Sequence, residues 1–135
     1  MKYSKKVFFF LLILGLAYFT TYFSMYEYSK ERSSSCFDCS YQGDIFISSL
    51  FSSIILMMIF ILLKRLIKKE IVVFFFIVAY LIIISFNNYN IFVDRVSSWT
   101  SFSLKGELIG VFSNSYLYLI VSSSIVLVIT KFLKL

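Results

Sequence analysis

Residues 71–93, IVVFFFIVAYLIIISFNNYNIFV, form a run of 23 residues without Asp, Glu, Lys or Arg. As an α-helix this run would be about 35 Å long, enough to cross a hydrocarbon core about 30 Å thick. A helix is expected because the bilayer interior offers no water to the backbone of an isolated strand. The run therefore predicts a membrane-spanning helix, which is most densely apolar over residues 71–88.

Three further uncharged runs have the length of a membrane span. The whole chain of 135 residues is 60% hydrophobic and 15% charged, whereas soluble domains are about half apolar and a quarter charged. We therefore expect an all-α, polytopic membrane protein whose four transmembrane helices form an antiparallel bundle. The single membrane domain would cover residues 1–135, with spans at approximately 7–26, 45–63, 71–88 and 108–130.

The distribution of Lys and Arg predicts the orientation of the chain. One side of the membrane would hold nine of these residues and the other side four. Because the richer side usually faces the cytoplasm, we predict a multi-pass protein of the cytoplasmic (inner) membrane with both termini inside. A cytoplasmic loop would cover residues 64–70, and outer loops would cover 27–44 and 89–107.

The basic residues would lie directly against the bilayer. The net charge of +6 is thus explained by membrane topology and by attraction to anionic lipid. We expect contact with the lipid bilayer and no binding of nucleic acid. The first run follows a basic leader but lacks a small-x-small cleavage site, so we expect it to be retained as an anchor.

The chain carries a weak internal repeat. Sliding it against itself by 63 residues gives 12 identities over 72 gap-free pairs, where composition alone would give roughly seven. Gly43 then falls on Gly106, and Ser52 falls on Ser115. A duplication would produce a 2+2 bundle, and chance similarity between two membrane hairpins remains the alternative.

Cys36-Phe37-Asp38-Cys39 is the one chemical motif that we recognise. In an outer loop its thiols could be oxidised, so we expect a Cys36–Cys39 disulfide or two inert thiols. A redox dithiol, a metal ligand pair and a bond to another chain are the alternatives. With only two cysteines and no histidine in the chain, we expect no metal site and no cofactor.

The topology and this cysteine pair resemble the four-helix thiol oxidases that pass electrons from periplasmic partners to quinone. The resemblance implies a membrane thiol–disulfide oxidoreductase with Cys36 and Cys39 as its redox pair. Those enzymes relay electrons through a second cysteine pair, which this chain does not contain.

Small polar residues recur inside two of the predicted spans. They allow helices to approach closely and can form hydrogen bonds across the contact. We interpret them as helix-packing or partner-binding residues. They are Ser48, Ser49, Ser52, Ser53, Gly110, Ser113 and Asn114.

The second outer loop has the spacing of a short amphipathic helix on the membrane surface. Phe92, Val96 and Trp99 would share its apolar side, with Asp94 and Arg95 on the other side. Trp99 would anchor this helix at the interface.

A chain without charge inside its spans is better suited to binding than to proton or ion transport. We expect no buried charge and no catalytic residue, and we interpret the protein as an accessory or immunity-type subunit. Its partner would be another membrane protein, or the protein would self-associate. The alternatives are the oxidoreductase using Cys36 and Cys39 and a holin-like or channel-forming oligomer.

Overall fold

The computed structural model describes residues 2–36 and 38–132, which fold into four long helices in chain order. These residues contain no strand. All four helices are long and apolar enough to cross a membrane. The prediction of an all-α, multi-pass membrane protein is therefore confirmed. The elements are α1 (Lys2–Ser24), the 3₁₀ turn η1 (Tyr26–Tyr28), α2 (Tyr41–Leu66), α3 (Lys69–Arg95), the 3₁₀ turn η2 (Ser97–Trp99) and α4 (Leu104–Phe132).

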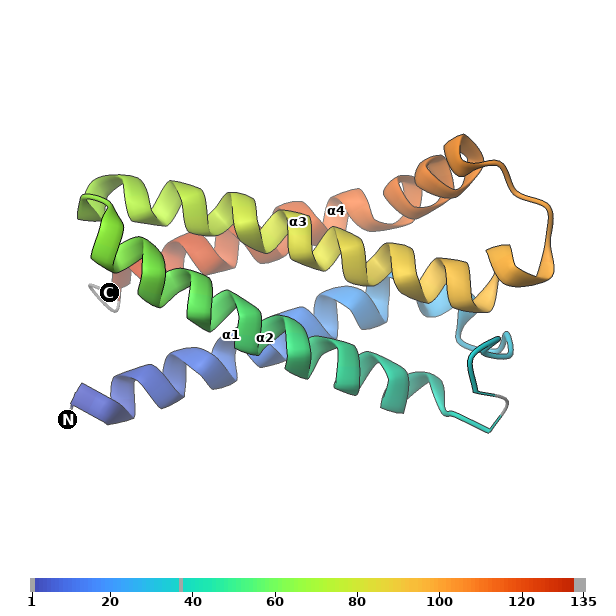
Figure 1. Cartoon of the computed structure of the whole chain (residues 1–135), viewed down its shortest axis with the longest axis horizontal. Coiled ribbons are helices and arrows are strands. Elements are labelled where there is room, and N and C mark those ends of the chain that lie inside the picture. Colours follow the sequence, from blue (N-terminus) through green and yellow to red (C-terminus); the bar gives the residue numbers. More distant parts are fainter. Residues whose placement is uncertain (1, 37, 133–135) are drawn as a thin grey trace.

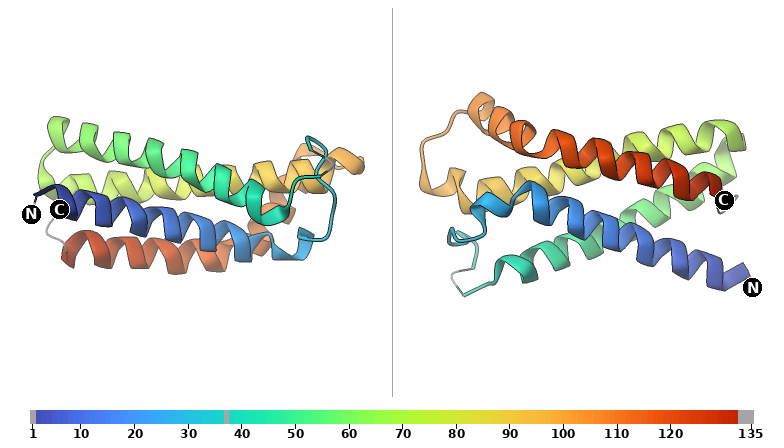
Figure 2. Two further views of the ribbon diagram at one scale, coloured as in Figure 1. Left: turned by 90° about the horizontal axis from the view of Figure 1, so that it is seen from below. Right: turned by 180° about the vertical axis from the view of Figure 1, so that it is seen from behind.

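The helices run up and down in an antiparallel bundle (Figure 1). Both ends of the chain and the tight turn between α2 and α3 lie at one end, which we call the terminal end (Figure 1). The connections over residues 25–40 and 96–103 lie at the opposite end, the loop end. Each helix packs against its two neighbours in the order α1, α2, α3, α4, as the two further views show (Figure 2). The contact between α1 and α4, which we call the α1–α4 seam, is the least extensive of the four contacts between neighbouring helices.

The bundle interior contains two apolar clusters. The larger, the terminal cluster, is stabilised by the rings of Phe9, Phe60 and Phe76, whose centroids lie 4.9–5.8 Å apart. The smaller, the loop cluster, surrounds the fully buried Met25. The terminal cluster consists of Phe9, Ile13, Ala17, Leu56, Phe60, Val72, Phe76, Tyr80, Ile84, Leu119 and Val126, and the loop cluster of Met25, Tyr41, Ile45, Ile91, Phe92 and Val111.

The outer faces of the helices are also apolar. Large side chains such as Phe51, Phe74 and Ile120 each expose more than 60% of their surface. A third or less of each span is buried inside the bundle. Such a surface suits lipid, because a soluble monomer rarely exposes apolar patches of this extent.

The starts of α2 and α4 share one capping arrangement. Ser40 Oγ accepts a hydrogen bond from the Gly43 N–H at 3.1 Å, and Ser103 Oγ accepts one from the Gly106 N–H at 3.2 Å. A serine oxygen in this place satisfies one of the free N–H groups of the first turn. The two caps are 63 residues apart, as a duplication would leave them, and the repeat itself stays a prediction.

Helix α3 extends beyond the span expected for it. It continues to Arg95, through residues that were expected to begin a loop, because Ile91 and Phe92 pack into the loop cluster. The prediction of an amphipathic surface helix around Phe92 and Trp99 is therefore wrong. Phe92 is buried, and only the short turn η2 follows α3 before α4 begins.

Candidate functional site

Buried polar side chains separate the two apolar clusters on every helix. On α1 they follow Ala17 and precede Met25, and on α3 they lie between Ile84 and Ile91. Each of them exposes 5% of its surface or less. This polar layer consists of Thr20, Thr21, Ser24, Ser49, Ser52, Ser53, Asn87, Asn88 and Ser115.

Some members of the polar layer are paired. The Ser52 hydroxyl donates to Asn87 Oδ1 at 2.9 Å and so links α2 to α3. The hydroxyls of Thr20 and Tyr80 lie 3.4 Å apart and link α1 to α3. Interhelical hydrogen bonds of this kind contribute about 0.6 kcal/mol each on average in a membrane.

Other members have no hydrogen-bond partner among the described residues. This holds for the hydroxyl oxygens of Thr21, Ser24 and Ser49, for Asn87 Nδ2 and for both polar atoms of the Asn88 side chain. A buried polar atom without a partner costs roughly 1–3 kcal/mol. So many of them at one depth make the polar layer the candidate for function rather than for stability.

Ser24 is the member of the polar layer that lies beside a surface groove, although its own side chain is buried. The groove has a volume of about 460 Å³ and lies near the loop end, between α1 and α4, which are the neighbouring helices with the least extensive contact. We call it the α1–α4 groove. Its walls are formed by Phe23, Ser24, Tyr26, Glu27, Ser113, Asn114, Tyr116, Leu117 and Tyr118.

The polar wall of the groove has a defined geometry. Asn114 Nδ2 donates to the Tyr28 hydroxyl at 2.8 Å and to Glu27 Oε2 at 3.4 Å. Burial, together with the nearby Glu27 carboxylate, raises the pKa of Tyr28, so its hydroxyl keeps its proton and can still donate. Glu27 is the one ionisable acid among the lining residues and remains exposed. The groove therefore presents a carboxylate, an amide and hydroxyls beside aromatic rings.

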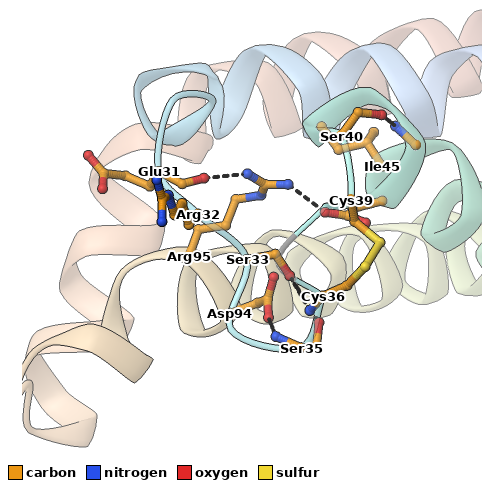
Figure 3. Close-up of polar contacts among 12 residues, drawn as sticks. Glu31, Arg32, Ser33, Ser35, Cys36, Cys39, Ser40, Ile45, Asp94 and Arg95 are labelled. Carbon is orange, nitrogen blue, oxygen red and sulfur yellow. Dashed lines mark hydrogen bonds and ion pairs between the residues drawn. A yellow bond between two sulfur atoms is a disulfide. The ribbon is translucent and has the colours of Figure 1, made fainter.

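A buried ion pair lies at the loop end. Arg95 exposes 3% of its surface, and its Nη2 is 2.5 Å from Asp44 Oδ2. Its Nη1 donates to the Glu31 carbonyl oxygen (Figure 3). Its guanidinium lies 5.2 Å from the centre of the Tyr41 ring. The expectation of no buried charge is thus wrong. Arg95 stands just beyond the uncharged run, and the continuation of α3 carries it inside the fold.

Asp94, the neighbour of Arg95, forms hydrogen bonds with the connection between α1 and α2, residues 25–40. Its Oδ1 accepts hydrogen bonds from the Ser34 N–H and the Ser34 hydroxyl at 3.1 and 2.9 Å. It also accepts one from the Ser35 N–H at 2.9 Å (Figure 3). Trp99 Nε1 donates to the Arg32 carbonyl oxygen at 2.9 Å. The end of α3 and the turn after it thereby fix residues 31–35 over the loop end.

Cys36 and Cys39 are joined by a disulfide in this connection, with Cα atoms 5.3 Å apart (Figure 3). The Cys36 N–H donates to Ser33 Oγ at 3.1 Å. Cys36 is half-buried and Cys39 is exposed. The predicted pairing of the two cysteines is therefore present in the structure, whereas their redox function stays a prediction.

The predicted small polar residues fall into two places. Ser49, Ser52 and Ser53 lie in the polar layer, while the half-buried Ser48 donates to the Ile45 carbonyl oxygen at 3.0 Å. On α4, Gly110 is half-buried, whereas Ser113 and Asn114 lie at a surface groove.

Gly110 lies under the Phe92 ring, where an added Cβ would come within 3.1 Å of the ring. Ser113 and Asn114 line the α1–α4 groove, and Trp99 is exposed at the loop end. Two of the residues that the sequence singled out as helix-packing or partner-binding residues thus line the groove, whereas Ser24 and Glu27 were not singled out.

The missed members of the polar layer did leave a signal. Asn87 and Asn88 interrupt an otherwise apolar run, and they stand one helical turn after the buried Ile84. A search for polar residues in phase with the buried face would have found them.

No protein family, no curated protein and no solved structure matches this chain. The candidate site is accordingly derived from its own residues.

Removing the buried cation should weaken the bundle. Arg95→Met leaves Asp44 and the Glu31 carbonyl without their donor. We expect a loss of about 3 kcal/mol in unfolding free energy, the low end for a broken buried pair because Asp44 keeps some exposure. Thermal unfolding in detergent measures it. Lys105→Met, at an exposed site on α4, is the control, and equal melting of both variants would refute the ion pair.

Substituting either of two neighbouring asparagines by leucine should change the stability of the bundle, in opposite directions for the two sites. Asn88→Leu removes two polar atoms that have no partner among the described residues. We therefore expect the free energy of unfolding in detergent to rise by about 1–2 kcal/mol. Asn87→Leu removes the acceptor of the Ser52 hydroxyl and should lower stability. If Asn88→Leu is the more damaging of the two, Asn88 has a partner that this geometry does not provide.

Proposed function

We propose that this protein is a non-enzymatic subunit of the cytoplasmic membrane that binds a transmembrane helix of another protein in the α1–α4 groove. An immunity-type or other accessory role is the form that we favour. The observation that carries the proposal is the groove itself, which opens the bundle along its least extensive seam and exposes Glu27, Ser113 and Asn114.

The chemistry of the groove defines the partner. A neighbouring helix would cover the rings of Phe23 and Tyr118 and present hydrogen-bond donors to the polar wall. Glu27 is an anionic acceptor at the groove, so the matching residue is Lys, Arg or a side-chain amide donor. Such bonds are individually weak in a membrane, and several are needed for a firm interface.

The polar layer supports a binding role. Ser24 belongs to both the layer and the groove, and its hydroxyl has no hydrogen-bond partner among the described residues. The Ser24 hydroxyl is buried in the free bundle, so a partner helix would pair with it only by opening the α1–α4 contact, and the new bond would offset a cost already present. Binding would thereby stabilise the bundle that it joins.

The predicted orientation of the chain in the membrane indicates from which side a partner would reach the groove. With the termini in the cytoplasm, as the nine basic residues on that side favour, the loop end faces outward. The groove would then open within the outer half of the bilayer, and a partner arriving from outside could reach it.

A thiol–disulfide oxidoreductase is the second candidate. The exposure of Cys39 favours it, because an attacking thiol needs access to that sulfur. The absence of a second cysteine pair from the sequence weighs against it. The channel-forming oligomer remains a third reading, in which the partner in the groove is a second copy of this chain.

Site-specific photocrosslinking in native membranes tests the proposal. A photoreactive phenylalanine analogue replaces Tyr118 in the groove or, as the control, Phe51 on the exposed face of α2. We expect one discrete adduct with another protein from position 118 and none from position 51. Glu27→Gln combined with Asn114→Leu should reduce the adduct at least 10-fold, since two polar contacts are lost.

The identity of the adduct decides between the candidates. A partner whose crosslinked segment is a membrane helix with a basic or amide side chain supports the proposal. Adducts of this chain with itself favour the oligomer, and adducts with lipid alone contradict any protein partner. Cys36→Ser with Cys39→Ser should leave the adduct unchanged; its loss, together with mixed disulfides trapped by Cys39→Ser alone, would favour the enzyme.

A further inference from the structure

A second cavity lies at the other end of the bundle, between α1 and α2. Its volume is about 240 Å³. It is separate from the α1–α4 groove, which lies near the loop end. Its walls are formed by Lys6, Phe9, Met57, Phe60, Ile61, Lys64 and Arg65.

Three cations from two helices meet at this cavity. Lys6 lies in the first turns of α1, and Lys64 and Arg65 lie in the last turn of α2. The antiparallel packing of the two helices brings these distant sequence positions to one opening. Among the described residues that line the cavity none is acidic, and three are cationic.

The inner wall of the cavity is apolar. The rings of Phe9 and Phe60 are almost fully buried, with centroids 4.9 Å apart. Lys64 Nζ lies 5.0 Å from the centre of the Phe60 ring, a distance that suits a cation–π contact. Ile61 is 40% exposed and continues the apolar wall toward the outside of the bundle.

The order of charge and apolar surface along the helices matches an amphiphile. Phe9 follows Lys6 by three residues and Phe60 precedes Lys64 by four, so about one helical turn separates the cations from the rings on each side. The charged groups therefore lie nearer the end of the bundle than the rings do. A ligand that fits both needs an anionic head and an apolar tail.

We propose that this cavity binds the headgroup of an anionic phospholipid. Lys6, Lys64 and Arg65 would contact the phosphate, and one acyl chain would lie along Phe60 and Ile61. Basic pockets between transmembrane helices are suited to such headgroups, because the membrane supplies the ligand at the same depth. A free phosphate would gain nothing from the apolar wall. The site does not depend on the partner proposed for the α1–α4 groove.

Native mass spectrometry of the purified full chain in detergent tests the assignment. The added lipid is phosphatidylglycerol, phosphatidylcholine is the zwitterionic comparison, and glycerol phosphate represents the headgroup alone. We expect saturable binding of one phosphatidylglycerol, at least 10-fold tighter than that of the other two. Lys6→Gln with Arg65→Gln should weaken it about 10-fold or more, given the contribution of each basic residue near a charged surface.

The matched control removes two charges outside the cavity. Lys68→Gln with Lys131→Gln changes exposed positions near the same end of the bundle and should leave phosphatidylglycerol binding within about twofold of the unchanged protein. If both double variants lose the same affinity for phosphatidylglycerol, the effect comes from net charge alone, and the proposed site is overturned. Equal binding of glycerol phosphate, or of phosphatidylcholine, would overturn the assignment to an anionic lipid.

Discussion

Polar groups placed inside a lipid-embedded bundle must find their partners within the protein, and the arrangement of this fold follows from that constraint. The backbone meets it by forming four helices. The side chains meet it only in part. Ser52 pairs with Asn87 across two helices, whereas Asn88 lies between two apolar clusters without a partner among the described residues. An interior that served stability alone would carry apolar side chains at these positions.

The loop end shows how the bundle is held together without closing completely. Arg95 joins the end of α3 to the start of α2 through Asp44, and Asp94 holds the connection that follows α1. These contacts fix two helix ends and the connection between α1 and α2 at one end of the bundle. The contact between α1 and α4 is less extensive than those between the other neighbouring helices, and the groove there is lined by Glu27 and by the buried Ser24 of the polar layer.

The sequence predicted the four helices because each has a long run without charge, and a bilayer tolerates little else. It failed at the loop end, where local charge suggested a loop at Arg95 and tertiary packing of Phe92 carried α3 onward. It found Ser113 and Asn114 because they are conspicuous on an apolar helix. It missed Ser24 and Glu27, since the groove is formed by two helices far apart in the chain, and spacing along one helix cannot reveal it.

Disulfide formation between paired cysteines in native membranes tests most directly that the polar layer lies inside the bundle. In a Cys36→Ser and Cys39→Ser background, Ser52→Cys is combined with Asn87→Cys. In the unchanged protein Ser52 Oγ and Asn87 Oδ1 lie 2.9 Å apart. The matched pair, Phe51→Cys with Phe86→Cys, stands one residue earlier on each helix at exposed positions. After mild oxidation the first pair should resist alkylation and the second should remain reactive. Crosslinking of the second pair instead of the first would contradict the account.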